Sequence, residues 1–497
     1  MKITRPLVAA ALAGLVAAGL ATFAAPSPAG LTGDRTGDTG PATRVRDAVD
    51  DPAGYRGLAV ATVDGGQVRV AGIGERGTAG GDVDAGTPFE SGSLTKVMTG
   101  MLLADLVADG VVTPDDTLRQ LFPGRAFEDP AVGDVTLAEL AGHTSGLPRL
   151  APAPGGPLST VVAAVRGTDP YAGQDAAHVL GALTGTRVRD HRGEVTYSNF
   201  GMAVLGLALA ERAGTAYPEL LRQRLLDPLG MTATGFVGEG DPLPAGAATG
   251  GTGAGRPMRP WRAGGLAAAG IGMWTTADDL ARLLAATMAG TAPGADATTP
   301  RYGPDDERIG FGWFTTRYDD REIVWHNGAT GGFSAYVGFE RATGRGVVLL
   351  GNTDRGVEAV GLRLLGVDRP TDGPDANWLL IAVTVVLLAG GGLGLAATAT
   401  GTGSTWRPAP DRLGLAGGVL SAAASLVLAH RAGAWLDVPA VLWPVAVGFA
   451  VAGVVLAVFR WPGLPLIGRG TPWVRWTGAA IGAVVSGGLI LAVAVLT

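Results

Sequence analysis

Hydrophobic and polar positions alternate with two different periods between residues 45 and 365. Residues 57–77 contain β-rich runs on either side of the turn Asp64-Gly65-Gly66, which predicts a hairpin. Residues 310–328 and 333–352 predict further antiparallel strands. Helical periodicity or an apolar face predicts helices in the middle of the region, at residues 94–109, 136–148, 202–213, 217–229 and 276–288. Strands at both ends with helices between them indicate one α+β domain, in which helices and a helical subdomain flank an antiparallel sheet.

Four stretches near the C-terminus lack Asp, Glu, Lys and Arg: about residues 378–400, 413–430, 438–459 and 476–496. Each has about the 20 residues that a helix needs to cross the hydrocarbon core of a bilayer. We therefore expect four transmembrane helices over residues 378–497. A buried helical core of a soluble protein is the alternative.

Arginines predict how these helices are oriented. Two of them, Arg407 and Arg412, lie between the first and second stretches, whereas only Arg431 lies between the second and third. The third and fourth stretches are separated by three more, Arg460, Arg469 and Arg475. By the positive-inside rule, the first and third loops are cytoplasmic, which places the α+β domain on the extracytoplasmic side of the cell membrane.

The N-terminal residues 1–29 fit an export signal or an uncleaved anchor. Lys2 and Arg5 precede the apolar run Leu7–Ala25, and small residues follow it. Residues 30–44 and 366–377 are rich in Pro, Gly, Thr and Asp, so we expect them to be linkers on either side of a domain at 45–365.

Composition excludes several classes of function. The chain has 38 basic and 44 acidic residues, so we expect no basic face for nucleic acid. It has no cysteine, which excludes disulfides, thiolate metal sites and a cysteine nucleophile.

Lysine is the residue whose use stands out. Of the 38 basic residues, only Lys2 and Lys96 are lysines, and the others are arginines. Ser93 precedes Lys96 by three positions, which places both on one face of a helix. A serine nucleophile needs an adjacent base, and a buried lysine can be a neutral base whereas an arginine stays charged. The alternative is a solvated surface lysine.

Two further segments offer polar groups for a site. Tyr197 and Asn199 lie just before an apolar helix, where a neighbouring ammonium would lower the tyrosine pKa and the amide could hold a substrate carbonyl. His326 ends an apolar strand before Gly328 and Ala329, where a free strand edge offers N–H donors for an oxyanion. Taken singly, these segments also fit a turn with a packed aromatic ring and a histidine at a strand turn.

The order of these motifs resembles the serine β-lactamase and penicillin-binding-protein superfamily, in its class C β-lactamase-like branch. The motifs are Ser93-Leu-Thr-Lys96, "HTSGLP" at 143–148, Tyr197-Ser-Asn199, "PLGM" at 228–231 and His326-Asn-Gly328. The resemblance implies a β-lactamase/transpeptidase-like fold without a cofactor or metal. It makes Ser93 the acylated nucleophile, Lys96 and Tyr197 the proton-transfer pair, and Asn199 a substrate contact. The N–H groups of Ser93 and Ala329 would form the oxyanion hole.

One position departs from the resemblance. His326 stands where many penicillin-recognising members have a lysine whose charge helps to bind the substrate carboxylate, and histidine is mostly uncharged near neutral pH. We therefore expect a membrane-tethered serine hydrolase that cleaves an ester, amide or D-amino-acid peptide bond in a small molecule or peptide. The alternative is a catalytically silent ligand-binding or sensory module coupled to the membrane helices. The sequence leaves the oligomeric state open.

Overall fold

The computed structural model describes residues 4–33, 35–78, 80–262, 264–368, 378–401, 410–468 and 472–494. The chain forms two compact units. One consists of residues 29–253 and 257–372, and the other of residues 1–28, 254–256 and 373–497.

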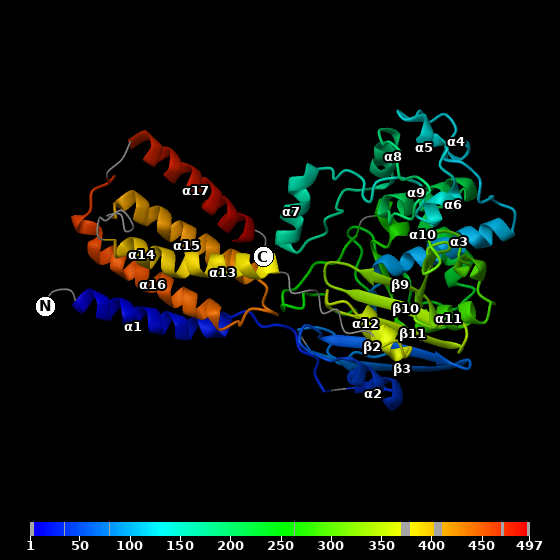
Figure 1. Cartoon of the computed structure of the whole chain (residues 1–497), viewed down its shortest axis with the longest axis horizontal. Coiled ribbons are helices and arrows are strands. Elements are labelled where there is room, and N and C mark those ends of the chain that lie inside the picture. The colour runs from blue at the N-terminus through cyan, green and yellow to red at the C-terminus, as the bar shows by residue number, and fades with distance from the viewer. Residues whose placement is uncertain are drawn as a thin grey trace. The chain divides into compact units, whose positions relative to one another are not determined.

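An eight-stranded antiparallel sheet organises the larger unit (Figure 1). Its strand order is β1-β3-β2-β11-β10-β9-β8-β7. The strands are β1 (Arg35–Gly37), β2 (Gly57–Asp64), β3 (Gln67–Gly74), β7 (Glu307–Ile309), β8 (Phe314–Tyr318), β9 (Arg321–Ala329), β10 (Ser334–Glu340) and β11 (Arg345–Gly351). A second sheet has the order β4-β6-β5 and consists of β4 (Phe89–Glu90), β5 (Gly235–Phe236) and β6 (Met273–Thr275).

Helices pack on both faces of the large sheet. On one face lie α2 (Thr39–Ala48), against β1 to β3, and α12 (Glu358–Leu364), against β10 and β11. On the other face, α11 (Ala277–Met288) packs on β2, β3 and β11, and the 3₁₀ turn η2 (Gly92–Leu94) contacts β9 and β10. This turn leads into the buried helix α3 (Thr95–Ala108), so the residues of the predicted Ser93/Lys96 pair lie close to the sheet.

The remaining helices of this unit include those of the expected helical subdomain, and α9 packs against α3, α4, α6, α8 and α10. They are α4 (Leu118–Leu121), α5 (Pro130–Gly133), α6 (Leu137–Ala141), α7 (Gly156–Arg166), α8 (Ala176–Thr184), α9 (Asn199–Ala213) and α10 (Tyr217–Leu221). The predicted α+β class, the hairpin at residues 57–77 and the strands at 310–328 and 333–352 are therefore confirmed.

Two predictions about this unit are wrong. Residues 30–44 were expected to be a linker, but β1 pairs with β3 and α2 begins at Thr39, so the segment is part of the fold. The helix expected at 136–148 ends at Ala141, because His143 adopts a left-handed backbone with φ of 57°. The linker expected at 366–377 falls mostly on residues 369–377, which lie outside the described residues.

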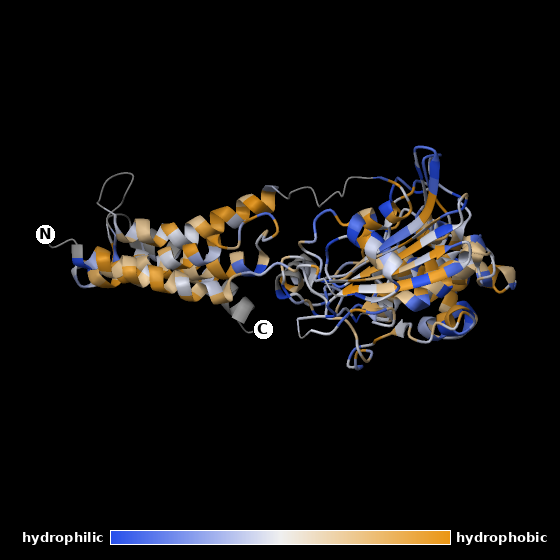
Figure 2. Ribbon diagram, turned by 90° about the horizontal axis from the view of Figure 1, so that it is seen from below, coloured by the Kyte–Doolittle hydropathy of each residue, from blue (hydrophilic) through white to orange (hydrophobic). Residues whose placement is uncertain are grey.

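The second unit is built from apolar helices, which are coloured mostly hydrophobic in Figure 2. They are α1 (Thr4–Ala21), α13 (Trp378–Ala389), α14 (Leu395–Ala399), α15 (Arg412–Ala432), α16 (Leu442–Arg460) and α17 (Pro472–Ala494). Within the described residues, four segments are helical, long and apolar enough to cross a membrane: Arg5–Ala24, Trp378–Ala399, Arg412–Ala432 and Leu442–Gly463. The last three coincide with predicted spans, and α17 is a helix at the fourth.

The N-terminal helix α1 packs against α16. A Cβ added to Gly14 would lie only 2.7 Å from the carbonyl oxygen of Gly448, and one added to Gly448 would lie 2.9 Å from the Cβ of Ala18. Small residues that let two backbones approach are typical of helix pairs in membranes.

Candidate active site

Ser93 and Lys96 meet at the start of α3. Lys96 Nζ lies 2.8 Å from Ser93 Oγ and donates a hydrogen bond of 2.6 Å to the carbonyl oxygen of Ala269. The Lys96 side chain is fully buried. Burial lowers the pKa of Lys96 well below its usual range, and the positive charge of Arg149 lowers it further. A neutral amine in contact with the serine hydroxyl can accept its proton.

Glycines allow the turn that carries Ser93 to pack directly against β9. Gly92 has φ of 52°, and a Cβ there would lie 2.8 Å from the backbone nitrogen of Ala329. A Cβ on Gly328 would lie 2.1 Å from the carbonyl oxygen of Ser91 and 3.2 Å from the backbone nitrogen of Ser93. Backbone therefore meets backbone at this point, and a side chain at either glycine would separate the two segments.

The end of β9 presents a free edge beside this turn. Strand β8 pairs with β9 only as far as Phe314 opposite Trp325. On the other edge, the Thr330 N–H donates to the carbonyl oxygen of Phe333 at 3.0 Å. Because hydrogen-bonded pairs alternate along an antiparallel ladder, the N–H of Ala329 points away from β10, toward the free edge. This places an N–H donor where the predicted oxyanion hole requires one.

Tyr197 stands over the Ser93/Lys96 pair. Its ring centroid lies 5.0 Å from Lys96 Nζ, and its hydroxyl hydrogen-bonds Ser93. Burial raises the pKa of Tyr197 to about 12, although the bond to Ser93 acts in the opposite direction. The prediction that a neighbouring positive charge lowers this pKa is wrong, because the effect of burial on Tyr197 is larger than that of the nearby charge of Arg149. At neutral pH the Tyr197 hydroxyl is protonated and can donate.

Two neutral histidines lie on either side of the Tyr197 ring. His326 is fully buried, and this burial is the main cause that lowers its pKa to about 3. Its Nδ1 lies 2.5 Å from the carbonyl oxygen of Asn327 and must carry the proton, while Nε2 has no hydrogen-bond partner among the described residues. His143 packs on Tyr197 with ring centroids 4.6 Å apart, and burial lowers its pKa well below the usual range. The site therefore has no histidinium at neutral pH.

The "HTSGLP" segment holds the loop that carries Tyr197. His143 accepts a hydrogen bond from the Ser198 N–H at 3.2 Å and, through its carbonyl oxygen, one from the Thr196 N–H at 2.7 Å. Ser198 donates to the carbonyl oxygen of Pro148 and caps α9 by accepting from the Gly201 N–H. The two motifs thus form one structure on both sides of Tyr197.

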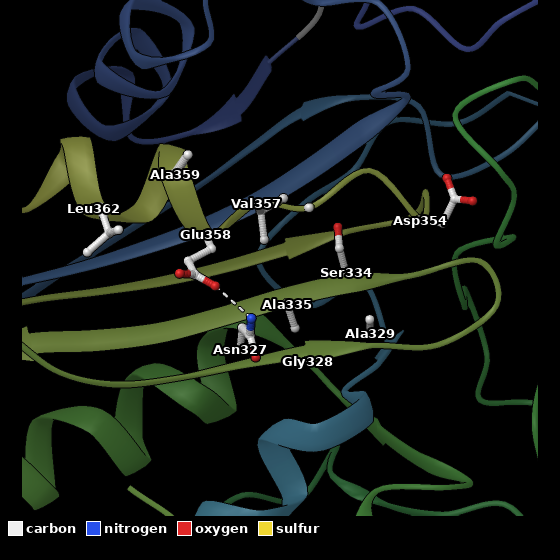
Figure 3. A pocket seen from close by; sticks show the side chains of 11 residues that line it. Asn327, Gly328, Ala329, Ser334, Ala335, Asp354, Val357, Glu358, Ala359 and Leu362 are labelled. Carbon is white, nitrogen blue, oxygen red and sulfur yellow. Dashed lines mark hydrogen bonds between the residues drawn. The ribbon is translucent and has the colours of Figure 1, made fainter. Parts of the chain in front are cut away.

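Asn199 and Asn327 both line the cleft described below. Asn199 hydrogen-bonds the Tyr171 hydroxyl, and its Oδ1 has no partner among the described residues. Asn327 Nδ2 donates to Glu358 Oε2 at 2.6 Å, and Figure 3 shows the two side chains pointing toward each other from β9 and the start of α12. Because a carboxylate only accepts, this bond fixes the amide orientation of Asn327. A cavity of about 270 Å³ lies around this pair.

The cleft above Ser93 has a volume of about 410 Å³. Four of the predicted site residues line it, namely Ser93, Tyr197, Asn199 and Ala329, whereas Lys96, His326 and Gly328 are not among its lining residues. The sequence did not indicate several other residues of its walls: Arg149, Tyr171, Trp261, Phe314 and Trp325. Only Arg149 carried a signal, since it directly follows "HTSGLP". No cluster of three or more His, Cys, Asp or Glu suited to a metal occurs in the described part of the chain.

Comparison with known proteins identifies relatives of the larger unit. A family model described as Beta-lactamase matches residues 44–367. D-alanyl-D-alanine-carboxypeptidase/endopeptidase AmpH of Escherichia coli K12 is 30% identical over 197 residues, which cover 39% of this chain and 49% of that protein. Penicillin-binding protein 4 of Amycolatopsis lactamdurans is 30% identical over 162 residues, covering 32% of this chain and 39% of that protein. The match thus spans about half or less of these curated relatives.

Solved structures support the fold. A beta-lactamase/D-alanine carboxypeptidase from Pseudomonas syringae superposes with a TM-score of 0.56 at 20% identity, covering 67% of this chain and 100% of that one. A class C beta-lactamase from Rhodobacter sphaeroides gives a TM-score of 0.55 at 20% identity, covering 66% of this chain and 98% of that one.

Proposed function

The chain belongs to the beta-lactamase family, and from this premise we propose that it is a membrane-tethered, extracytoplasmic serine hydrolase that works through an acyl-enzyme. The observation that carries the proposal is the fully buried Lys96 amine 2.8 Å from Ser93 Oγ. A lysine in this environment is a base rather than a cation, and only catalysis needs a base at a serine hydroxyl.

The reaction follows from the contacts. Ser93 Oγ bonds to the substrate carbonyl carbon while its proton passes to Lys96 Nζ. The oxyanion that forms accepts hydrogen bonds from the N–H groups of Ser93 and Ala329. The intermediate then collapses, the bond to the leaving group breaks, and the leaving group takes the proton through the Tyr197 hydroxyl. Water, deprotonated by the same groups, cleaves the acyl-enzyme and restores Ser93.

The substrate bond is an ester, amide or D-amino-acid peptide bond. A neutral His326 supports weak rather than strong recognition of penicillins, because the cation that binds their carboxylate in many relatives is missing at this position. AmpH and penicillin-binding protein 4 are named for action on D-alanyl-D-alanine and for penicillin binding, so both activities are candidates.

The test is parallel labelling of the full chain and of Ser93→Ala in detergent with a fluorescent fluorophosphonate and a fluorescent penicillin. We expect Ser93-dependent labelling by the phosphonate and much slower labelling by the penicillin. Absence of Ser93-dependent labelling by both probes would refute the enzyme and favour the ligand-binding or sensory alternative.

A further inference from the structure

One residue that lines the cleft, Arg149, has a side chain that stays positively charged. Among the described residues that line the 410 Å³ cleft, Arg149 is the only arginine or lysine. Lys96 is fully buried and does not line the cleft, and burial lowers the pKa values of Lys96 and of the two histidines beside Tyr197, which disfavours their charged forms. Positive potential in the cleft therefore comes from Arg149.

Arg149 is anchored by its backbone while its side chain remains available. Its carbonyl oxygen accepts hydrogen bonds from the N–H groups of Asn199 and Phe200, at 3.0 and 3.2 Å. Its guanidinium carbon lies 5.2 Å from the centroid of the Tyr197 ring. The side chain is exposed and forms no ion pair with a carboxylate in the described part of the chain.

Asp169, an acidic residue two positions before the wall residue Tyr171, already has hydrogen-bond partners. The Asp169 carboxylate accepts from the backbone N–H of Tyr171 at 2.8 Å and from that of Arg262 at 2.7 Å. The charge of Arg149 acts on Lys96, Tyr197 and Tyr171 alike, which places the guanidinium among the groups of the site.

We propose that Arg149 is the specificity residue of this cleft and binds a carboxylate of the substrate. The inference rests on the proposed hydrolase, whose substrate class it narrows to carboxylate-bearing esters or amides. A guanidinium forms paired, charge-assisted hydrogen bonds with a carboxylate. Trp261 and Tyr171, whose ring centroids are 5.2 Å apart, provide an apolar surface beside it, and the unpartnered Oδ1 of Asn199 accepts an N–H.

The test compares matched neutral and anionic esters. If the carboxylate lies on the acyl part, p-nitrophenyl hydrogen glutarate is the substrate and p-nitrophenyl butyrate its neutral partner. If it lies on the leaving group, 4-carboxyphenyl butyrate is the substrate and 4-acetylphenyl butyrate its neutral partner. The readout is the ratio of kcat/KM for the anionic ester to that for the neutral ester, which cancels effects common to both.

Three variants of the full chain in detergent give the comparison: Arg149→Gln, Arg149→Lys and the control Arg212→Gln, an exposed arginine at the far end of α9. In at least one pair, we expect Arg149→Gln to lower the ratio about tenfold or more, since hydrogen bonds to charged groups are worth that much. Arg149→Lys should keep part of the preference, and Arg212→Gln all of it. If Arg149→Gln slows the anionic and neutral esters equally in both pairs, Arg149 only tunes Lys96 and the inference is wrong.

A binding measurement separates this inference from the proposed function. In the Ser93→Ala background, which cannot turn over, calorimetry compares hippurate with hippuramide. We expect hippurate to bind about tenfold more tightly, and Arg149→Gln to remove the difference. Equal affinities of the two ligands would overturn the role of Arg149 even in an active hydrolase, and a preference for hippurate would support it even if no ester were cleaved.

Discussion

Lys96→Arg tests whether Lys96 is a base or only a cation. The substitution replaces an amine whose charged form is disfavoured by burial with a guanidinium that stays charged and cannot act as a base. Removing a general base costs about 10²- to 10⁴-fold in rate, or about 3 to 5 kcal/mol in the activation barrier. We therefore expect the rate at which a fluorophosphonate modifies Ser93, by forming a P–O bond and releasing fluoride, to fall by at least about 100-fold; this reaction stands in for acylation below.

The fold of the variant needs its own control, because the larger side chain enters a fully buried position. Overpacking costs about 1–3 kcal/mol of stability. Lys96→Met has a similar volume and no charge, and leaves the Ala269 carbonyl oxygen without its donor at a cost of about 1–3 kcal/mol. We expect both variants to give cooperative melting curves and both to lose acylation.

The pH dependence of the wild type gives a second readout. Burial lowers the pKa of Lys96 well below its usual range, so its amine loses its proton at a lower pH than an exposed lysine does. We expect the acylation rate to be flat from pH 7 to 9, whereas a lysine with an ordinary pKa would make it rise about tenfold per pH unit. A folded Lys96→Arg variant that acylates within threefold of the wild type, or a rate that climbs steadily to pH 9, would refute the reasoning.

Three further predictions concern other parts of the molecule. Gly328→Ala puts a Cβ 2.1 Å from the carbonyl oxygen of Ser91, just before Ser93, so the rate of Ser93 modification should fall at least about tenfold. A cooperative melting curve shows that the variant is folded, and an unchanged rate would mean that the contact is not tight. Burial raises the pKa of Glu90 from 4.5 to about 7, so the folded state holds this proton more tightly than the unfolded chain does. The free energy of unfolding should therefore fall by about 3 kcal/mol as pH rises from 4.5 to 7. Melting curves of Glu90→Gln should lack this decline, and parallel pH profiles of the two proteins would contradict it. The chain has no cysteine, so the double variant Ala18→Cys with Gly448→Cys can form only one disulfide, and we expect it to form if the N-terminal helix is retained. The two helices need to move apart by only about 1 Å to reach disulfide geometry. A mature protein whose mass lacks residues 5–24 would contradict the retention of this helix.

Strands and helices with a strong local period could be predicted from the sequence. The hairpin at β2 and β3 has both an apolar run and a glycine turn, and α11 has a broad apolar face. The short strand β1 has neither, since its residues Arg35–Gly37 are half-exposed or exposed and join the sheet by backbone pairing with β3. Such an edge strand is determined by its neighbour β3 rather than by its own sequence.

The chemistry of Ser93 and Lys96 was predictable because one helical turn brings them together. The walls of the cleft were not, because Tyr171, Trp261 and Phe314 come from three distant segments that only the fold assembles. The direction of the Tyr197 pKa shift is set by the burial of its hydroxyl, and the extent of that burial cannot be read from spacing.

The most direct test of the account is to map the acyl-type adduct on the protein by mass spectrometry after reaction with a fluorophosphonate. We predict one adduct per chain, on Ser93. Ser91→Ala is the matched control, because Ser91 is a buried serine just before the same turn whose hydroxyl lies 3.0 Å from Thr95 Oγ1 rather than beside a lysine. The adduct should persist in Ser91→Ala and disappear in Ser93→Ala. An adduct on another residue, or one that survives in Ser93→Ala, would contradict the assignment of Ser93 as the nucleophile.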